Sequence, residues 1–101
     1  MKVITNSDVK KAYKRVVNNR MHAFGDTDLD KKVIRINKKK AKKKGTKGEV
    51  LDSIVHEVSH AKHPKMKEKN IRKHTKRLIK KLNKRHKKRY YSMFVNQDNS
   101  Q

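Results

Sequence analysis

Cysteine and tryptophan are absent from this chain of 101 residues, and proline occurs once. Without cysteine there is no disulfide framework, zinc ribbon, iron–sulfur site or cysteine nucleophile. No apolar run reaches the roughly 18 residues of a membrane span, and residues 1–6 lack the apolar stretch of a signal peptide. We therefore expect an intracellular, cytoplasmic protein without a membrane partner. The length allows one small domain, which we expect to be monomeric.

Acidic residues are also scarce, with 9 Asp and Glu against 31 Lys and Arg, for a formal net charge of +22. Such a charge favours a polyanionic partner, and nucleic acid above all. Lysine enrichment on solvated faces would give the same composition without any such function. The residues that we select as candidates for phosphate contacts are Lys38, Lys39, Lys40, Lys42, Lys43, Lys44, Arg72, Lys73, Lys76 and Lys80.

The first half of the chain predicts one helix and a short β element. Apolar residues within 7–19 recur at i, i+4, i+7 and i+8, which predicts a helix capped by Ser7. The Asp-rich segment 25–30 reads as a turn. Residues 32–37 alternate and are β-branched, which predicts a strand with 21–24 as its hairpin partner.

The second half predicts two longer amphipathic helices. Seven of the residues from 38 to 48 are Lys and two are Gly, which favours a basic loop or a frayed helix. Apolar spacing predicts a helix over 49–62, which Pro64 ends, and another over about 66–90. We expect a polar tail over 96–101.

These elements together predict an α+β fold over residues 1–95. Three amphipathic helices would pack with a short β-hairpin or edge strand that lies beside the helix over 49–62. The hydrophobic content of 32% gives such a domain a thin core. A bound metal ion would add stability to it.

The motif His56-Glu57-Val58-Ser59-His60 has the form H-E-x-x-H. On a helix, positions i and i+4 share a face, so both imidazoles can bind one Zn²⁺ ion. Glu57 lies beside them, where it can take a proton from water and pass it to a leaving amine. The opposite face of the helix is apolar and would anchor it, with Leu51, Ile54, Val55 and Val58.

A catalytic zinc site needs a third protein ligand and an open position for water. Glu68 is the preferred candidate, because it precedes Ile71 on the apolar stripe of the next helix, where an acid needs a partner. His63 is the alternative, with His74 ranked below it. We expect the remaining histidines, His22 and His86, to be solvated. No single group is identified as the oxyanion stabiliser, and His63, His74 and a tyrosine remain candidates.

Residues 51–68 resemble the small H-E-x-x-H metallopeptidases of phages and bacteria, which are minimal zincins distantly similar to SprT-like proteins. The resemblance lies in the metal motif, Pro64 four residues after it, and an acid, Glu68, at the start of the next helix. Residues 34–37 also resemble the edge strand that borders a zincin cleft and pairs with substrate. The resemblance spans roughly residues 25–82.

The chain departs from better-defined members of these groups in two ways. It has no Cys₄ ribbon of the SprT-like kind, because it has no cysteine. It also lacks the Gly and third His of a metzincin, because His63 and Met66 occupy those positions.

Two functions therefore compete. The first is a zinc peptidase that acts on a protein or peptide substrate, with nucleic acid as a second partner, in the cytoplasm, which would be that of the host if the protein is viral. His56, His60 and Glu68 would hold the ion, and Glu57 would act as general base. The second is a non-enzymatic nucleic-acid-binding protein whose metal site is structural or degenerate.

Overall fold

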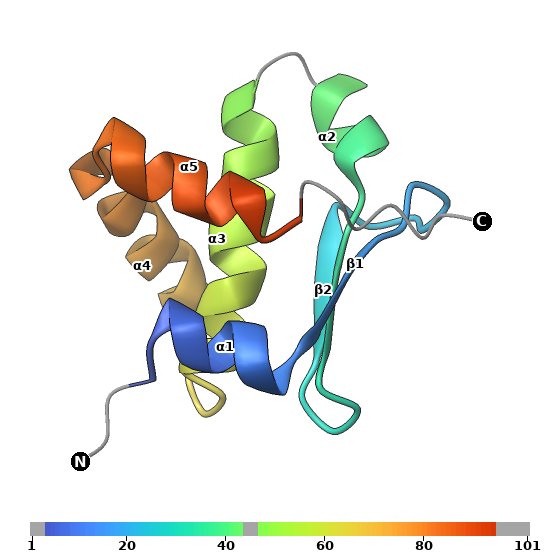
Figure 1. Ribbon diagram of the computed structural model, residues 1–101, viewed down its shortest axis with the longest axis horizontal. Helices are drawn as coiled ribbons and strands as arrows, with labels where there is room; N and C mark the ends of the chain where they lie inside the picture. The colour runs from blue at the N-terminus through green and yellow to red at the C-terminus, as the bar shows by residue number, and fades with distance from the viewer. Residues whose placement is uncertain (1–3, 44–46, 95–101) are drawn as a thin grey trace.

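The computed structural model describes residues 4–43 and 47–94, which form a compact α+β fold (Figure 1). No helix in these ranges is long and apolar enough to cross a membrane. The predicted tail over 96–101 lies outside the described residues. In chain order the elements are α1 (Asn6–Ala12), β1 (Lys14–Val17), β2 (Gly25–Asp28), β3 (Val33–Ile36), α2 (Lys38–Lys43), α3 (Lys47–Lys62), α4 (Glu68–Lys81) and α5 (Lys84–Ser92).

The three strands form one sheet in the order β1-β3-β2. The predicted strand over 32–37 is confirmed as β3, which pairs in parallel with β1 and antiparallel with β2. Because β3 is central, the expectation that residues 34–37 form an edge strand is wrong. The strand at the sheet edge next to α3 is β2 instead.

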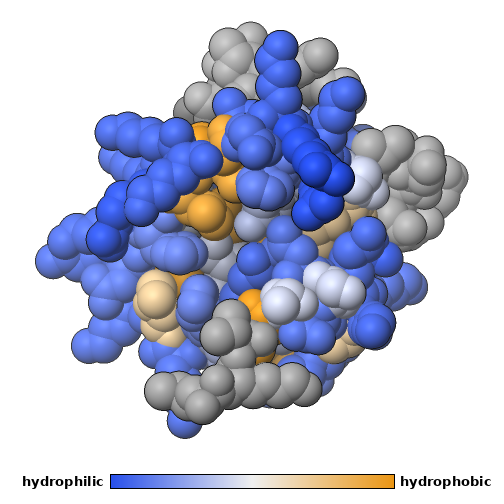
Figure 2. Space-filling model, turned by 60° about the vertical axis from the view of Figure 1, so that its left-hand side comes forward, coloured by the Kyte–Doolittle hydropathy of each residue, from blue (hydrophilic) through white to orange (hydrophobic). Residues whose placement is uncertain are grey.

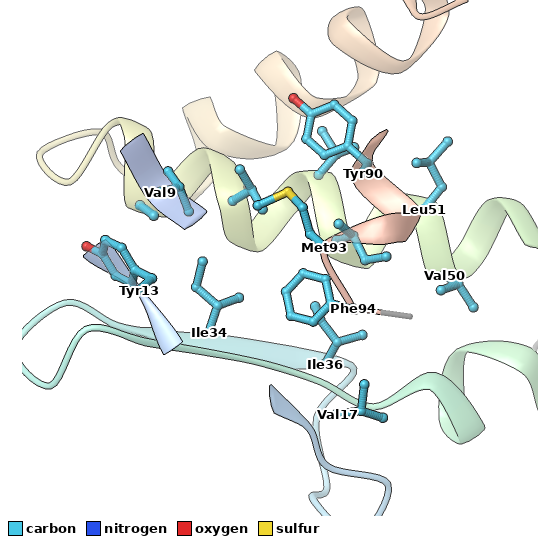
Figure 3. Packing of buried hydrophobic residues seen from close by; sticks show 14 residues of the cluster. Val9, Tyr13, Val17, Ile34, Ile36, Val50, Leu51, Tyr90, Met93 and Phe94 are labelled. Atoms are coloured by element: carbon cyan, nitrogen blue, oxygen red, sulfur yellow. The ribbon is translucent and has the colours of Figure 1, made fainter. Parts of the chain in front are cut away.

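Helix α3 is the centre of the fold, and the predicted helix over 49–62 is confirmed. Figure 1 shows the sheet on one side of α3 and α4 on the other, with α5 crossing α3. The apolar face of α3 is fully buried, with Ile54, Val55 and Val58 at 0% exposure. Figure 3 shows core side chains from α1, the sheet and the end of α5 gathered around this helix.

The prediction of one helix over residues 7–19 is wrong in its second half. Helix α1 ends at Ala12, and Lys14–Val17 form β1. Thr5 caps the helix, and Asp8 bonds back to the Thr5 backbone. The β-branched pair Val16 and Val17 favours an extended chain, and the ladder with β3 stabilises that conformation.

The predicted hairpin is displaced along the sequence. Residues 21–24 do not pair with β3, and the segment predicted as a turn, 25–30, contains β2 instead. The turn lies at residues 29–32, where the Asp28 carboxylate accepts from the backbone N–H groups of Asp30 and Lys31. A bidentate pair between Arg35 and Asp26 ties the two strands together across the sheet.

Two predictions in the basic second half also need correction. The segment 38–48 is not one loop, because Lys38–Lys43 form α2 and α3 begins at Lys47. The helix predicted over 66–90 is two helices, because Leu82 is extended and Asn83 caps α5 through the His86 backbone N–H.

Candidate metal centre

Helix α3 presents the H-E-x-x-H motif on the side opposite its apolar face. His56 and His60 are half-buried, with side-chain exposures of 20% and 23%. Their rings lie edge to face, with centroids 4.9 Å apart. The i, i+4 spacing therefore gives the shared face that the sequence predicts.

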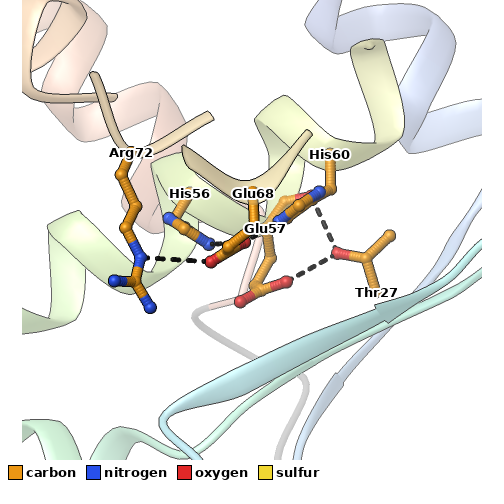
Figure 4. A network of polar contacts seen from close by, with 6 residues as sticks. All are labelled: Thr27, His56, Glu57, His60, Glu68 and Arg72. Atoms are coloured by element: carbon orange, nitrogen blue, oxygen red, sulfur yellow. Dashed lines mark hydrogen bonds and ion pairs between the residues drawn. The ribbon is translucent and has the colours of Figure 1, made fainter. Parts of the chain in front are cut away.

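Glu68, the first residue of α4, meets both histidines (Figure 4). Its Oε1 atom lies 3.0 Å from His56 Nε2 and 2.6 Å from His60 Nε2. These three residues are a group whose ligand atoms lie within 4.8 Å of one another. Glu68, which the sequence predicted as the preferred third ligand, thus lies next to both histidines of the motif.

The charges around Glu68 favour its carboxylate form. Burial alone would raise its pKa, but contacts with His60 and His56 outweigh burial and hold the pKa below its ordinary value. Its second oxygen accepts from Arg72 Nε at 3.3 Å, one helical turn along α4. The Glu68 carboxyl group is therefore favoured as an anion, which can bind a cation. Arg72 contacts its second oxygen.

Glu57 is the most buried acid of the site, at 8% exposure. Burial raises its pKa, and the Thr27 hydroxyl and the two neighbouring histidines offset only part of this effect. Thr27 Oγ1 on β2 lies 2.9 Å from Glu57 Oε1 and 2.8 Å from the Glu57 carbonyl oxygen (Figure 4). A single hydroxyl thus links the edge strand to both the side chain and the backbone of Glu57.

Gly25, at the start of β2, is the second residue of this strand that lies close to Glu57. A Cβ atom at this position would lie 2.8 Å from the Arg35 carbonyl oxygen and 3.1 Å from Glu57 Cγ. Any larger residue would therefore push against both the β3 backbone and the Glu57 side chain. Neither Gly25 nor Thr27 is among the site residues predicted from the sequence, because both lie in the Asp-rich segment predicted as a turn.

The site opens into a cleft of about 580 Å³ between α3, α4 and the chain leading into β2. Glu57, His56 and Glu68 line one part of this cleft. The rest of its lining comes from Ala23, Phe24, Gly25, Asp52, Ser53, Arg72, Thr75 and Lys76. His56 and Glu68 therefore face a space that can hold several atoms of a substrate, whereas His60 is not part of its lining.

The alternative ligands lie elsewhere in the described structure. The rings of His63 and His74 pack against each other, with centroids 5.1 Å apart, and neither residue lines the cleft. Burial and the nearby His63 lower the pKa of His74. His22 and His86 are exposed, as expected. None of the tyrosines lines this cleft, so no oxyanion group from the predicted set is found in it.

The predicted phosphate-binding residues differ in their partners. Lys38 Nζ donates to the Phe94 carbonyl oxygen, Lys40 Nζ donates to the His22 carbonyl oxygen, and Arg72 pairs with Glu68. Lys39, Lys73, Lys76 and Lys80 are exposed. Lys44 lies outside the described residues, and the side chains of Lys42 and Lys43 are not described.

The donor set of the three residues fits a divalent transition metal. Two imidazole nitrogens and one carboxylate oxygen are the ligands found in catalytic zinc sites of the His₂Glu kind, which leave a position open. The half-exposed Glu68 carboxylate and the adjoining cleft leave that position accessible. No family model matches the chain, and searches among curated proteins and solved structures give no significant match either.

Proposed function

We propose that this protein is a zinc-dependent peptidase of the minimal zincin type. The observation that carries the proposal is the close approach of the ligand atoms of His56, His60 and Glu68, next to a cleft that His56, Glu57 and Glu68 line. His56, His60 and Glu68 would hold the ion. When bound there, zinc polarises a carbonyl group and lowers the pKa of water.

Glu57 would be the general base of the reaction. Its carboxylate accepts a proton from the attacking water, whose oxygen bonds to the carbonyl carbon of the substrate. As the peptide C–N bond breaks, Glu57 gives this proton to the leaving amine. Its burial suits this role, because burial raises the pKa of the carboxyl group and so makes it a stronger proton acceptor than an exposed glutamate.

The edge strand would orient the substrate. Strand β2 ends the sheet order, and its first residue, Gly25, lines the cleft. An extended peptide can add to such an edge through backbone hydrogen bonds, which favours peptide over other amide substrates. We therefore assign to β2 the pairing with substrate that was expected of residues 34–37.

The test is hydrolysis of a quenched fluorescent peptide library by the zinc-loaded protein. We expect cleavage that a chelator abolishes and that zinc restores. Glu57→Gln should keep the zinc and lower kcat by about 10²–10⁴-fold. Asp30→Asn, the same change of carboxyl to amide in the exposed turn, is the matched control and should leave kcat unchanged. Zinc binding without any cleavage would favour the structural-metal alternative and contradict the proposal.

A further inference from the structure

Helices α4 and α5 carry a large excess of positive charge. Helices α4 and α5 together hold twelve Lys and Arg residues and one acid, Glu68, which belongs to the metal centre. The acids elsewhere concentrate in β2, in the turn after it and along the cleft, as Asp26, Asp28, Asp30, Asp52 and Glu57.

The basic side chains of α4 project away from the core in a regular row. Lys69, Lys73 and Lys80 recur at i, i+4 and i+11, all are exposed, and they lie opposite the buried Ile71. From Lys69 to Lys80 the helix rises about 16 Å at 1.5 Å per residue. This row is long enough to meet several phosphates of a nucleic-acid backbone.

Helix α5 continues the positive surface. Arg85 and Lys88 are exposed on the side away from the buried Tyr90. We call Lys69, Lys73, Lys80, Arg85 and Lys88 the basic face. Figure 2 brings the side of the molecule with α4 and α5 forward, and hydrophilic side chains cover most of it.

The residues of the basic face differ in their partners from Arg35, Arg72, Lys38 and Lys40. Within the described residues, none of the five takes part in an ion pair. By contrast, Arg35 and Arg72 pair with acids, and Lys38 and Lys40 donate to backbone carbonyl oxygens. Unpaired, exposed charges of one sign are the ones that release counterions when a polyanion binds.

We propose that the basic face binds the phosphate backbone of a nucleic-acid duplex without reading its sequence. A membrane surface fits less well, because Ile4 is the one large hydrophobic residue that is exposed in the described structure, and it precedes α1. Single strands fit less well, because Tyr90 is buried and Tyr91 half-buried, which leaves no aromatic platform for bases on α5.

Sequence-independent binding follows from the residue types on the face. Four of the five are Lys, which contact phosphate as point charges, whereas recognition of base edges uses planar bidentate groups. The face is separate from the metal-ligand group, so this proposal does not rest on the peptidase activity. Nucleic acid would instead bring the cleft close to proteins that occupy the same duplex.

The test is binding of a 20-base-pair DNA duplex of arbitrary sequence to the zinc-loaded protein at several salt concentrations. One variant carries glutamine at all five positions of the basic face. The matched control carries glutamine at five exposed basic positions on other elements, namely Lys10, Lys11, Lys14, Arg20 and Lys31. Both variants have the same net charge, so they separate a defined surface from the charge of the whole molecule.

We expect the basic-face variant to reduce the slope of log K against log salt by about 0.9 for each lost phosphate contact, and the control to change it much less. Equal losses in the two variants would overturn the proposal, as would wild-type binding to anionic lipid vesicles that exceeds binding to DNA. If the five-fold variant does not fold, the pair Lys73→Gln and Lys80→Gln, compared with Lys10→Gln and Lys14→Gln, applies the same criterion.

Discussion

The two faces of helix α4 differ in how many partners their charged side chains have. On the cleft side, Glu68 meets His56, His60 and Arg72, so that one carboxyl group has three specific partners. On the outer side, Lys69 and Lys73 have no ion-pair partner in the described structure and repeat the same charge. Single substitutions should therefore abolish function in the cleft, whereas the outer face should lose function gradually as charges are removed.

The largest effect should come from Glu68 on the cleft side, and its neighbour Lys69 on the outer side is the control. Glu68→Ala should lower zinc affinity at least about 100-fold, because loss of a supporting hydrogen bond alone costs 10–100-fold. Lys69→Ala, one residue along, should leave zinc affinity unchanged. Competition with a chromogenic chelator measures both. If His63→Ala lowers the affinity and Glu68→Ala does not, the ligand assignment is wrong.

A smaller but still large effect is expected at Gly25. The added methyl group of Gly25→Ala would press on the Arg35 carbonyl oxygen and on Glu57 Cγ. We expect the free energy of unfolding to fall by about 1–3 kcal/mol, as for other overpacked sites. Urea unfolding followed by circular dichroism measures it. An unchanged midpoint would mean that β2 does not approach α3 this closely.

The Thr27 hydroxyl should have a moderate effect that is confined to catalysis. Thr27→Val keeps the shape and removes the donor to Glu57, so we expect kcat to fall about 10-fold with little change in KM. Thr27→Ser retains the hydroxyl and should restore most of the rate. Steady-state kinetics with a cleaved peptide measure both variants. Equal losses in Val and Ser would show that shape matters and the hydrogen bond does not.

The smallest effect concerns stability and pH. Burial raises the pKa of Glu57 above its ordinary value of 4.5, so the folded state holds this proton more tightly than the unfolded chain. Its contribution to stability is therefore present at low pH and is lost as pH rises through the folded pKa. In protein freed of metal by a chelator, Glu57→Gln should raise Tm by a few degrees at pH 7.

The comparison between pH values is the control for this last prediction. Below pH 4.5 both side chains are neutral, so the difference in Tm between Glu57→Gln and wild type should largely disappear. A constant difference across this range would mean that packing of the amide, and not the buried charge, is responsible.

Some of this structure could be predicted from sequence, because the relevant signals are local. The apolar spacing of α3 and the alternation of β3 each have one reading, and both elements are confirmed. The preference for Glu68 came from an acid placed on an apolar stripe, and the fold brings that acid to His56 and His60. An acid on an apolar helix face needs a polar partner, and this requirement predicted the contact between α4 and α3.

Other features depend on contacts that no local pattern contains. Val16 and Val17 fit a helical stripe equally well, and their pairing with β3 makes them a strand. Gly25 and Thr27 lie in an Asp-rich segment with few β-branched residues. The close approach of Gly25 to the Arg35 carbonyl oxygen and the hydrogen bond of Thr27 to Glu57 are therefore visible only in three dimensions. The break before α5 likewise has no proline or glycine to announce it.

The most direct test of the metal centre is the zinc content of the wild-type protein, purified without chelator and measured by atomic emission. We predict one zinc ion per chain, and less than a tenth of that in His60→Ala under the same conditions. A metal-free wild-type protein with a folded circular dichroism spectrum, which also fails to take up zinc on addition, would contradict the account.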